Sequence, residues 1–155
     1  METPTRTVIQ NAYLVDGSGS PAMHADIAFE GDFITEVAAP QSLPTPSTTR
    51  VIDADGRLVT PGWVDIHTHY DAQATWDPWL TPSSWHGVTS VVMGNCGVGF
   101  APASSDRHDW LIALMEGVED IPGTAMTEGI TWEWTSFEEY LTALESRPHV
   151  IDFAA

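Results

Sequence analysis

The sequence predicts an α/β fold that starts as a small antiparallel sheet and continues as the beginning of a (β/α)8 barrel. Up to about residue 60, short apolar runs are separated by turns rich in Gly, Pro and Ser, which is typical of β-hairpins. After that point strands alternate with helical segments, and this order implies parallel strands joined by crossover helices. A complete barrel needs roughly 250 residues. We therefore expect two domains: 1–60, a small β segment, and 61–155, the first two or three strands of a TIM barrel.

Turn residues set the expected limits of the strands in the first domain. We place these strands at residues 7–16, 26–29, 33–37, 50–54 and 57–60. Glu30-Gly31-Asp32 predicts a hairpin, because glycine readily adopts the positive φ that a tight turn needs. Asp55-Gly56 predicts a second hairpin for the same reason. The stretch 38–49 is rich in Pro, Ser and Thr and is expected to be a surface loop.

The second domain is expected to alternate between strands and helices. We place strands at 62–69, 88–95 and 149–153, and helices at 83–86, 106–118 and 137–146. Gly87 suits the left-handed position after the first helix. Ser136 with Glu139, or Thr135 with Glu138, offers a capping box for the last helix. Helical spacing predicts that one face of 106–118 enters the core, formed by Trp110, Leu111, Leu114, Met115 and Val118.

The acidic stretch 116–134 fits no single element, because glycines interrupt it. Long loops after barrel strands often carry function. We interpret this stretch as a loop that covers a substrate, with a solvated excursion as the alternative.

Two histidines end the first strand of the second domain. In a strand, alternate side chains point to the same face, so Asp65, His67 and His69 share one face. Val64 and Ile66 are expected to pack into the core on the other face. Two imidazoles about one pleat apart can bind a single divalent metal ion. We therefore predict that His67 and His69 are metal ligands.

Further polar residues follow the ends of the same two strands. Cys96 comes directly after the strand 88–95, and the carboxyl ends of parallel strands meet at one edge of a sheet. We therefore predict Cys96 as a third metal ligand. Tyr70, Asp71 and Asn95 are expected to surround the pocket. Asp65 is expected to orient an imidazole through its free ring N–H.

Composition limits the classes of partner. The chain has 5 Lys+Arg and 22 Asp+Glu, and its net charge of −17 excludes nucleic acid and anionic membrane as expected partners. The single cysteine leaves no internal disulfide and fits a reducing compartment. Residues 1–6 lack the basic and apolar regions of a signal peptide, and no run is long enough to span a membrane. We expect a cytoplasmic protein.

The strand 61–69 resembles the first barrel strand of the amidohydrolase superfamily. Together with Tyr70-Asp71-Ala72-Gln73 and the stretch 86–97, it is similar to the N-acyl-D-amino-acid deacylase (D-aminoacylase) branch, mainly through Asn95-Cys96-Gly97. The resemblance runs from about residue 7 to the end of the chain, because the first segment is similar to the N-terminal β-sandwich of that superfamily. In dihydroorotases an arginine normally occupies the position of Asp71, which counts against that relative.

The resemblance implies a zinc-dependent enzyme with one or two zinc ions. His67 and His69 would bind the first zinc ion, and Cys96 would take the bridging place that a carboxylated lysine has in relatives. The remaining histidine ligands of the family come from the fifth and sixth barrel strands, and its catalytic aspartate comes from the last. We therefore assign no catalytic residue here and expect the isolated chain to be inactive without the remainder of the barrel, from the same or another chain.

The expected reaction is hydrolysis of a non-peptide amide bond by metal-activated water. The resemblance favours a small-molecule N-acyl-D-amino acid as the substrate. Two alternatives remain open. The first is a hydantoinase-like or dihydroorotase-like cyclic amidase, or a deaminase, of the same superfamily. The second is a non-catalytic half-barrel that pairs with another chain.

Overall fold

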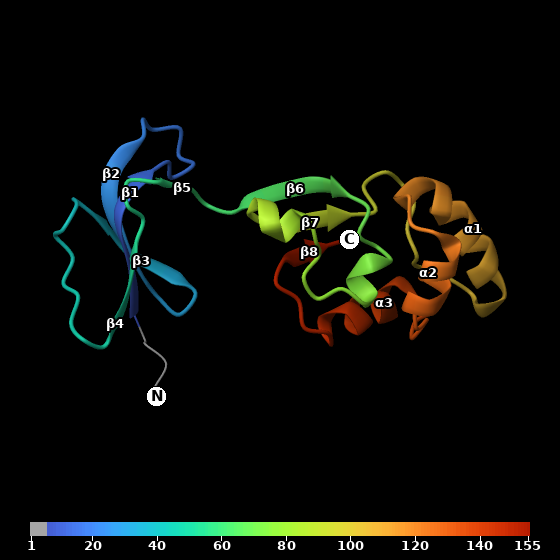
Figure 1. Cartoon of the computed structure of the whole chain (residues 1–155). Coiled ribbons are helices and arrows are strands. Elements are labelled where there is room, and N and C mark those ends of the chain that lie inside the picture. Colours follow the sequence, from blue (N-terminus) through green and yellow to red (C-terminus); the bar gives the residue numbers. More distant parts are fainter. Residues whose placement is uncertain (1–5) are drawn as a thin grey trace. The chain divides into compact units, whose positions relative to one another are not determined.

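The chain forms two compact units, Met1–Pro61 and Gly62–Ala155. The computed structural model describes residues 6–155, and Figure 1 shows its strands and helices. Residues 1–5, which contribute to the expected absence of a signal peptide, lie outside the described residues. Within the described part of the chain, no helix is both long and apolar enough to cross a membrane.

The first unit is one mixed sheet with strand order β3-β2-β1-β4, and β5 also pairs with β1. The predicted hairpin around Gly31 is confirmed: β2 and β3 are antiparallel, and Gly31 has a φ of +55°. The stretch between β3 and β4 contains no helix or strand, as expected for a loop. The strands are β1 (Arg6–Leu14), β2 (Met23–Glu30), β3 (Phe33–Ala38), β4 (Thr49–Asp53) and β5 (Leu58–Val59).

The second predicted hairpin is wrong, because β4 and β5 do not pair with each other. Both run parallel to β1, with Val51 beside Val8 and Leu58 beside Tyr13. The turn between them does not reverse the chain: the Gly56 N–H donates to the carbonyl of Asn11 (2.8 Å), which keeps the turn beside β1. The first unit is therefore a mixed sheet rather than an antiparallel one.

A buried aspartate stabilises the bulge of β1 at Asn11, the residue to which the turn between β4 and β5 is hydrogen-bonded. The pairing of β1 with β2 shifts register between Ile9 and Ala12, and Asn11 has a φ of +56°. Asp26 is fully buried, and its two oxygens accept from the backbone N–H groups of Asn11 (3.0 Å) and Gln41 (2.7 Å). Burial of this carboxylate is tolerated because both oxygens are hydrogen-bonded.

The second unit contains the predicted parallel sheet, with strand order β6-β7-β8. Its strands are β6 (Trp63–Thr68), β7 (Val88–Met93) and β8 (Asp152–Ala154). Short 3-10 helices connect β6 to β7, and three α-helices lie between β7 and β8. In Figure 1, α1 and α2 lie at the end of the sheet to which the arrowheads of β6 and β7 point. This is the α/β arrangement expected for the start of a barrel.

The helices agree with the predicted segments in position but not always in the buried face. In α1 the buried side chains are Leu111, Ile112 and Met115, whereas Trp110 is 58% exposed. In α3 the capping box joins Ser136 and Glu139. The irregular stretch contains one helix that the sequence did not predict, α2. The helices are η1 (Gln73–Thr75), η2 (Ser83–His86), η3 (Ser105–Arg107), α1 (His108–Glu119), α2 (Gly123–Gly129) and α3 (Phe137–Glu145).

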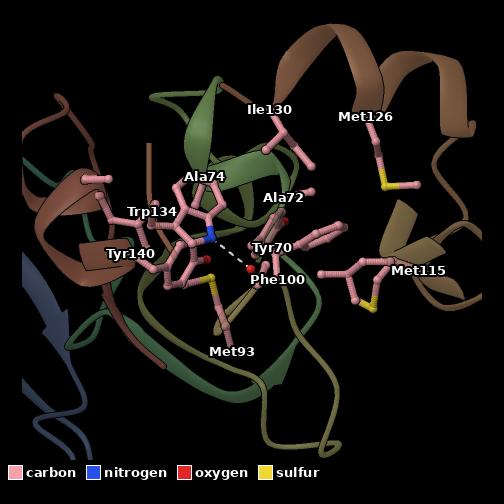
Figure 2. Packing of buried hydrophobic residues seen from close by; sticks show 14 of the residues in the cluster. Tyr70, Ala72, Ala74, Met93, Phe100, Met115, Met126, Ile130, Trp134 and Tyr140 are labelled. Atoms are coloured by element: carbon pink, nitrogen blue, oxygen red, sulfur yellow. Dashed lines mark hydrogen bonds between the residues drawn. The ribbon is translucent and has the colours of Figure 1, made fainter. Parts of the chain in front are cut away.

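Aromatic side chains fill the core of the second unit (Figure 2). Trp134 and Tyr140 meet edge to face, with ring centroids 5.0 Å apart. The indole N–H of Trp134 donates to the carbonyl of Phe100 (2.8 Å), the bond drawn as a dashed line in Figure 2. These contacts join α3 and the segment before it to the loop that follows β7.

The other face of β6 is not in this core, contrary to expectation. Val64 and Ile66 are 62% and 65% exposed. The core residues and the residues packed against them belong to β7 and β8, to the segments that follow β6 and β7, and to the helices. In the part of the chain that the structure describes, no helix covers this apolar face of β6.

Candidate metal centre

Two histidines project together from the end of β6. Their rings stack with centroids 5.5 Å apart and an interplanar angle of 29°. The alternation of the strand accounts for this, because His67 and His69 are two residues apart. His67 is exposed and His69 is half-buried, so solvent reaches the pair.

Cys96 joins the two histidines from the turn after β7. Its Sγ lies 4.0 Å from Nδ1 of His69, and the ligand-type atoms of His67, His69 and Cys96 all lie within 4.8 Å of one another. In a tetrahedral zinc site with such ligands these atoms stand roughly 3.5 Å apart, given metal–ligand bonds of about 2.0–2.3 Å. The separations are somewhat longer than that, and imidazole and thiolate are ligand types that zinc accepts, so the donor set is compatible with a zinc ion.

A hydrogen bond between the two strand ends holds the turn of Cys96 in place. The side-chain N–H of Asn95 donates to the carbonyl of Ile66 (2.8 Å), next to His67. Within the turn, the Gly97 N–H donates to the Gly94 carbonyl (2.9 Å). The sequence places Asn95 around the pocket, and the structure shows how it can fix the distance between Cys96 and β6.

The other predicted site residues take different positions. Asp65 accepts from the backbone N–H of His67 (3.1 Å), so its expected bond to an imidazole stays a prediction. Tyr70 is buried in the core, where its hydroxyl bonds to Ser83 Oγ (2.7 Å), and its place in a pocket stays a prediction. Asp71 lines a cavity of about 240 Å³ together with Tyr140, and His67, His69 and Cys96 are not among the residues that line it, so its role at the metal centre stays a prediction.

Asp71, two residues after His69, is enclosed. It is 3% exposed, and a Cβ on Gly99 would stand 2.8 Å from its Oδ1. Burial raises the pKa of Asp71 to about 6, against the opposing effects of backbone N–H groups and the nearby His69. The hydroxyl of Tyr140 donates to the backbone carbonyl of Asp71 (2.8 Å), which anchors this segment to α3.

Glu119, at the end of α1, is a second enclosed acid that sequence reasoning missed. Burial and, to a smaller extent, the charge of Asp71 raise the pKa of Glu119 to about 8. Both carboxyl oxygens of Glu119 and Oδ2 of Asp71 are buried without a hydrogen-bond partner among the described residues. The signal in the sequence is the helical spacing: Glu119 lies four residues after Met115, on the face of α1 that is otherwise apolar.

Parallel strands that end in histidine and cysteine side chains at one edge are what the first strands of a barrel metalloenzyme present. The chain belongs to the amidohydrolase family, whose model matches residues 50–152. A curated relative, D-aminoacylase of Alcaligenes xylosoxydans xylosoxydans, is 31% identical over 97% of this chain and 28% of its own length.

Two solved structures are similar over almost the whole chain. A D-aminoacylase structure that concerns its binuclear metal centre has a TM-score of 0.73 at 30% identity, over 96% of this chain and 28% of that one. N-acyl-D-glutamate deacylase from Bordetella bronchiseptica, complexed with zinc and a phosphonate inhibitor, has a TM-score of 0.67 at 27% identity, over the same shares. The chain therefore spans about a quarter of the length of these relatives, and it has the predicted fold class.

Proposed function

We propose that this chain supplies part of the active site of a metal-dependent amidohydrolase that deacylates N-acyl-D-amino acids. The observation that carries the proposal is the convergence of His67, His69 and Cys96, whose ligand-type atoms lie within 4.8 Å of one another. The substrate class is supported by relatives named D-aminoacylase and N-acyl-D-glutamate deacylase. Zinc is supported by the donor set and by its presence in the related deacylase complex.

The residues of this chain have distinct parts in that site. His67, His69 and Cys96 hold the metal ion, and Asn95 keeps the cysteine close to the histidines through its bond to β6. A bound zinc ion makes water more acidic and polarises an amide carbonyl. Asp71 follows His69 by two residues and is enclosed, so it is not assigned as a metal ligand. Asp65 remains a candidate for orienting an imidazole ring.

We also propose that residues 1–60 belong to a small β-sandwich and residues 61–155 to the barrel. The division of the chain into two compact units supports this boundary. In this proposal the chain supplies three metal ligands and no catalytic carboxylate. Hydrolysis therefore requires the remainder of the barrel, which the same or another chain provides. The isolated 155-residue chain should therefore be inactive.

The proposal is tested on the complete enzyme, comprising this chain and the remainder of the barrel. N-acetyl-D-amino acids, their L-enantiomers and a hydantoin are assayed before and after chelation, and again after zinc is added back. We expect turnover of the D-series only, loss of turnover on chelation and recovery with zinc. Undiminished turnover in the metal-free enzyme would overturn the metal assignment. Preference for the hydantoin would move the protein to the cyclic-amidase class.

A further inference from the structure

β6 is irregular at the point where it presents the two histidines. Between Asp65 and Thr68 its pairing with β7 shifts register. Over this stretch β6 advances three residues while β7 advances two, from Val91 to Met93, so β6 carries an extra residue. We call this stretch the β6 bulge. Bulges next to functional sites commonly re-aim a side chain, and one of the two residues inside this bulge is His67.

Side chains bond the backbone of the β6 bulge. Oδ1 of Asp65 accepts from the N–H of His67 (3.1 Å). The side-chain N–H of Asn95 donates to the carbonyl of Ile66 (2.8 Å). These are the two polar groups of a single peptide unit, the one that joins Ile66 to His67. Because backbone N–H and C=O groups need hydrogen-bond partners, the two bonds stabilise this peptide unit in the bulged strand.

Thr68, the last residue of β6, adds a bond that is buried. It is 6% exposed, and its Oγ1 donates to the carbonyl of Val92 on β7 (2.9 Å). A buried hydroxyl group without a partner is costly, so this bond fixes the side chain against β7. In the sequence Thr68 lies between His67 and His69. Val92 lies four residues before Cys96. The bond therefore joins the ends of the two strands from which the predicted metal ligands come.

Thr68 and Asn95 form a clasp across the ends of β6 and β7, which lie side by side (Figure 1). The Thr68 bond runs from β6 to β7, and the Asn95 bond returns from the turn after β7 to β6. On β6 the two bonded residues, Ile66 and Thr68, flank His67. On the other side, Asn95 directly precedes Cys96. Metal-binding side chains must be held to within about 0.5 Å of the productive geometry. The clasp therefore acts on the separation that metal binding requires.

We propose that Thr68 is a positioning residue of the metal centre: its buried hydroxyl, together with the amide of Asn95, locks the bulged end of β6 onto β7 and sets the separation of the two histidines from Cys96. This inference rests on the proposed metal site, because the residues that Thr68 positions are the ligands of that site. Thr68 acts through the strand backbone, since its hydroxyl is bonded to Val92. Loss of an outer residue that orients metal ligands typically lowers metal affinity by about 10- to 100-fold.

The experiment compares Thr68→Val with Thr68→Ser in the complete enzyme. Valine keeps the branched shape without the hydroxyl, whereas serine keeps the hydroxyl and loses only the methyl group. Thr75→Val is the matched control, because Thr75 is 5% exposed and its Oγ1 donates to the carbonyl of Ala72 (2.7 Å), a bond that joins no two strands. Zinc affinity is measured by competition with a chelator, and thermal unfolding is measured on the metal-free proteins.

We expect Thr68→Val to lower zinc affinity by about 10-fold and Thr68→Ser to stay within about 2-fold of the parent. Thr75→Val should lower the melting temperature about as much as Thr68→Val, because each loses one buried hydrogen bond. It should nevertheless keep the parental zinc affinity, which separates a loss of positioning from a general loss of stability.

Parental zinc affinity in Thr68→Val would overturn the proposal, and so would an equal loss of affinity in Thr68→Val and Thr75→Val. A loss in Thr68→Ser as large as that in Thr68→Val would also overturn it, because the methyl group rather than the hydroxyl would then be responsible. The zinc affinity of the parent tests the proposed function, whereas the ratio of variant to parent tests this inference. A parent enzyme that binds no zinc would overturn both.

Discussion

Two groups of ligand-type side chains each include a residue that follows β6, and the environments of the two groups are opposite. His67, His69 and Cys96 are at least partly accessible and close together, and none of the unpaired buried polar atoms found among the described residues belongs to them. Asp71, two residues after His69, is enclosed together with Glu119, and three of their four carboxyl oxygens are buried and unpaired within the described residues. The atoms of the first group are accessible to a metal ion. In the second group, ionisation of both carboxyl groups lowers the stability of the folded protein.

This difference separates binding from stability. Accessible imidazole and thiol groups remain hydrated before a metal ion binds, so their replacement changes the folded protein little. The pKa values of enclosed acids differ between the folded and the unfolded protein. Their protonation is therefore linked to the free energy of unfolding. Substitutions in the two groups should therefore have effects of different kinds, and the predictions that follow are ordered by the size of those effects.

The largest effect should follow from replacing both histidines. In the complete enzyme, His67→Asn with His69→Asn should lower amidase turnover by about 1,000-fold or more, because a metal ion contributes several kcal/mol to the reaction barrier. The free energy of unfolding of the metal-free protein should change by less than about 0.5 kcal/mol, since the pair is accessible. Turnover assays, metal analysis and denaturant unfolding measure these quantities. Full turnover in the double variant would exclude the metal assignment, and replacement of His24, in the first unit, provides a control.

The second effect concerns pH and stability of the metal-free protein. Burial is the main cause that raises the pKa values of Asp71 and Glu119 to about 6 and about 8, from their ordinary values of 3.8 and 4.5. Their contribution to stability is therefore fully present below pH 3.8, and it is lost as pH rises through about 6 and then about 8. The melting temperature should fall across this range.

Asp71→Asn should reduce that fall, because it removes one titrating group and the charge that acts on Glu119. The exposed Asp109→Asn, on α1, is the matched control and should keep the parental profile. Calorimetry from pH 5 to pH 9 measures the difference. A melting temperature that rises with pH in this range, or an Asp71→Asn profile equal to that of the parent, would contradict the enclosed-acid interpretation.

A smaller effect is expected when a methyl group is added beside the buried acid. A Cβ on Gly99 would stand 2.8 Å from Oδ1 of Asp71, too close for any unstrained contact. Gly99→Ala should destabilise the protein by about 1–3 kcal/mol, the usual range for overpacking. Gly117→Ala is the control on α1, where nothing lies within 4 Å of the added carbon, and it should be neutral or stabilising by roughly 0.5–1 kcal/mol. Denaturant unfolding decides between them, and equal stability of the two variants would count against close packing around Asp71.

The accessible group could be predicted from the sequence, because its determinants are local. Strand alternation places His67 and His69 on one face, and the parallel β-α-β order brings the end of β7, with Cys96, to the same edge. Whether these three residues bind a metal ion stays a prediction. The parallel sheet of the second unit and the hairpin at Gly31 were predicted for the same local reasons, and both are confirmed.

The enclosed group could not be predicted in the same way, because Asp71 and Glu119 are 48 positions apart in the sequence. Strand alternation and helical spacing predict which face of an element a residue lies on, but they do not predict which residues of other elements pack against that face. The same limit explains two corrections. Asp55-Gly56 has the residues of a hairpin turn, yet the Gly56 N–H donates to the carbonyl of Asn11 and β5 runs parallel to β1. Val64 and Ile66 have the pattern of a buried face, yet no described helix covers them.

The smallest effect should come from the hydroxyl that joins α3 to the enclosed group. Tyr140→Phe removes only the O–H that donates to the carbonyl of Asp71 (2.8 Å) and keeps the ring contact with Trp134. It should cost about 1 kcal/mol, the typical value of a buried hydrogen bond. Tyr13→Phe, 42% exposed in the first unit, is the control and should be neutral within about 0.5 kcal/mol. If urea unfolding gave both variants the same stability, the link between α3 and Asp71 would contribute nothing to the fold. A loss confined to Tyr140→Phe would show that the hydroxyl of Tyr140 stabilises the segment after His69 through the backbone carbonyl of Asp71.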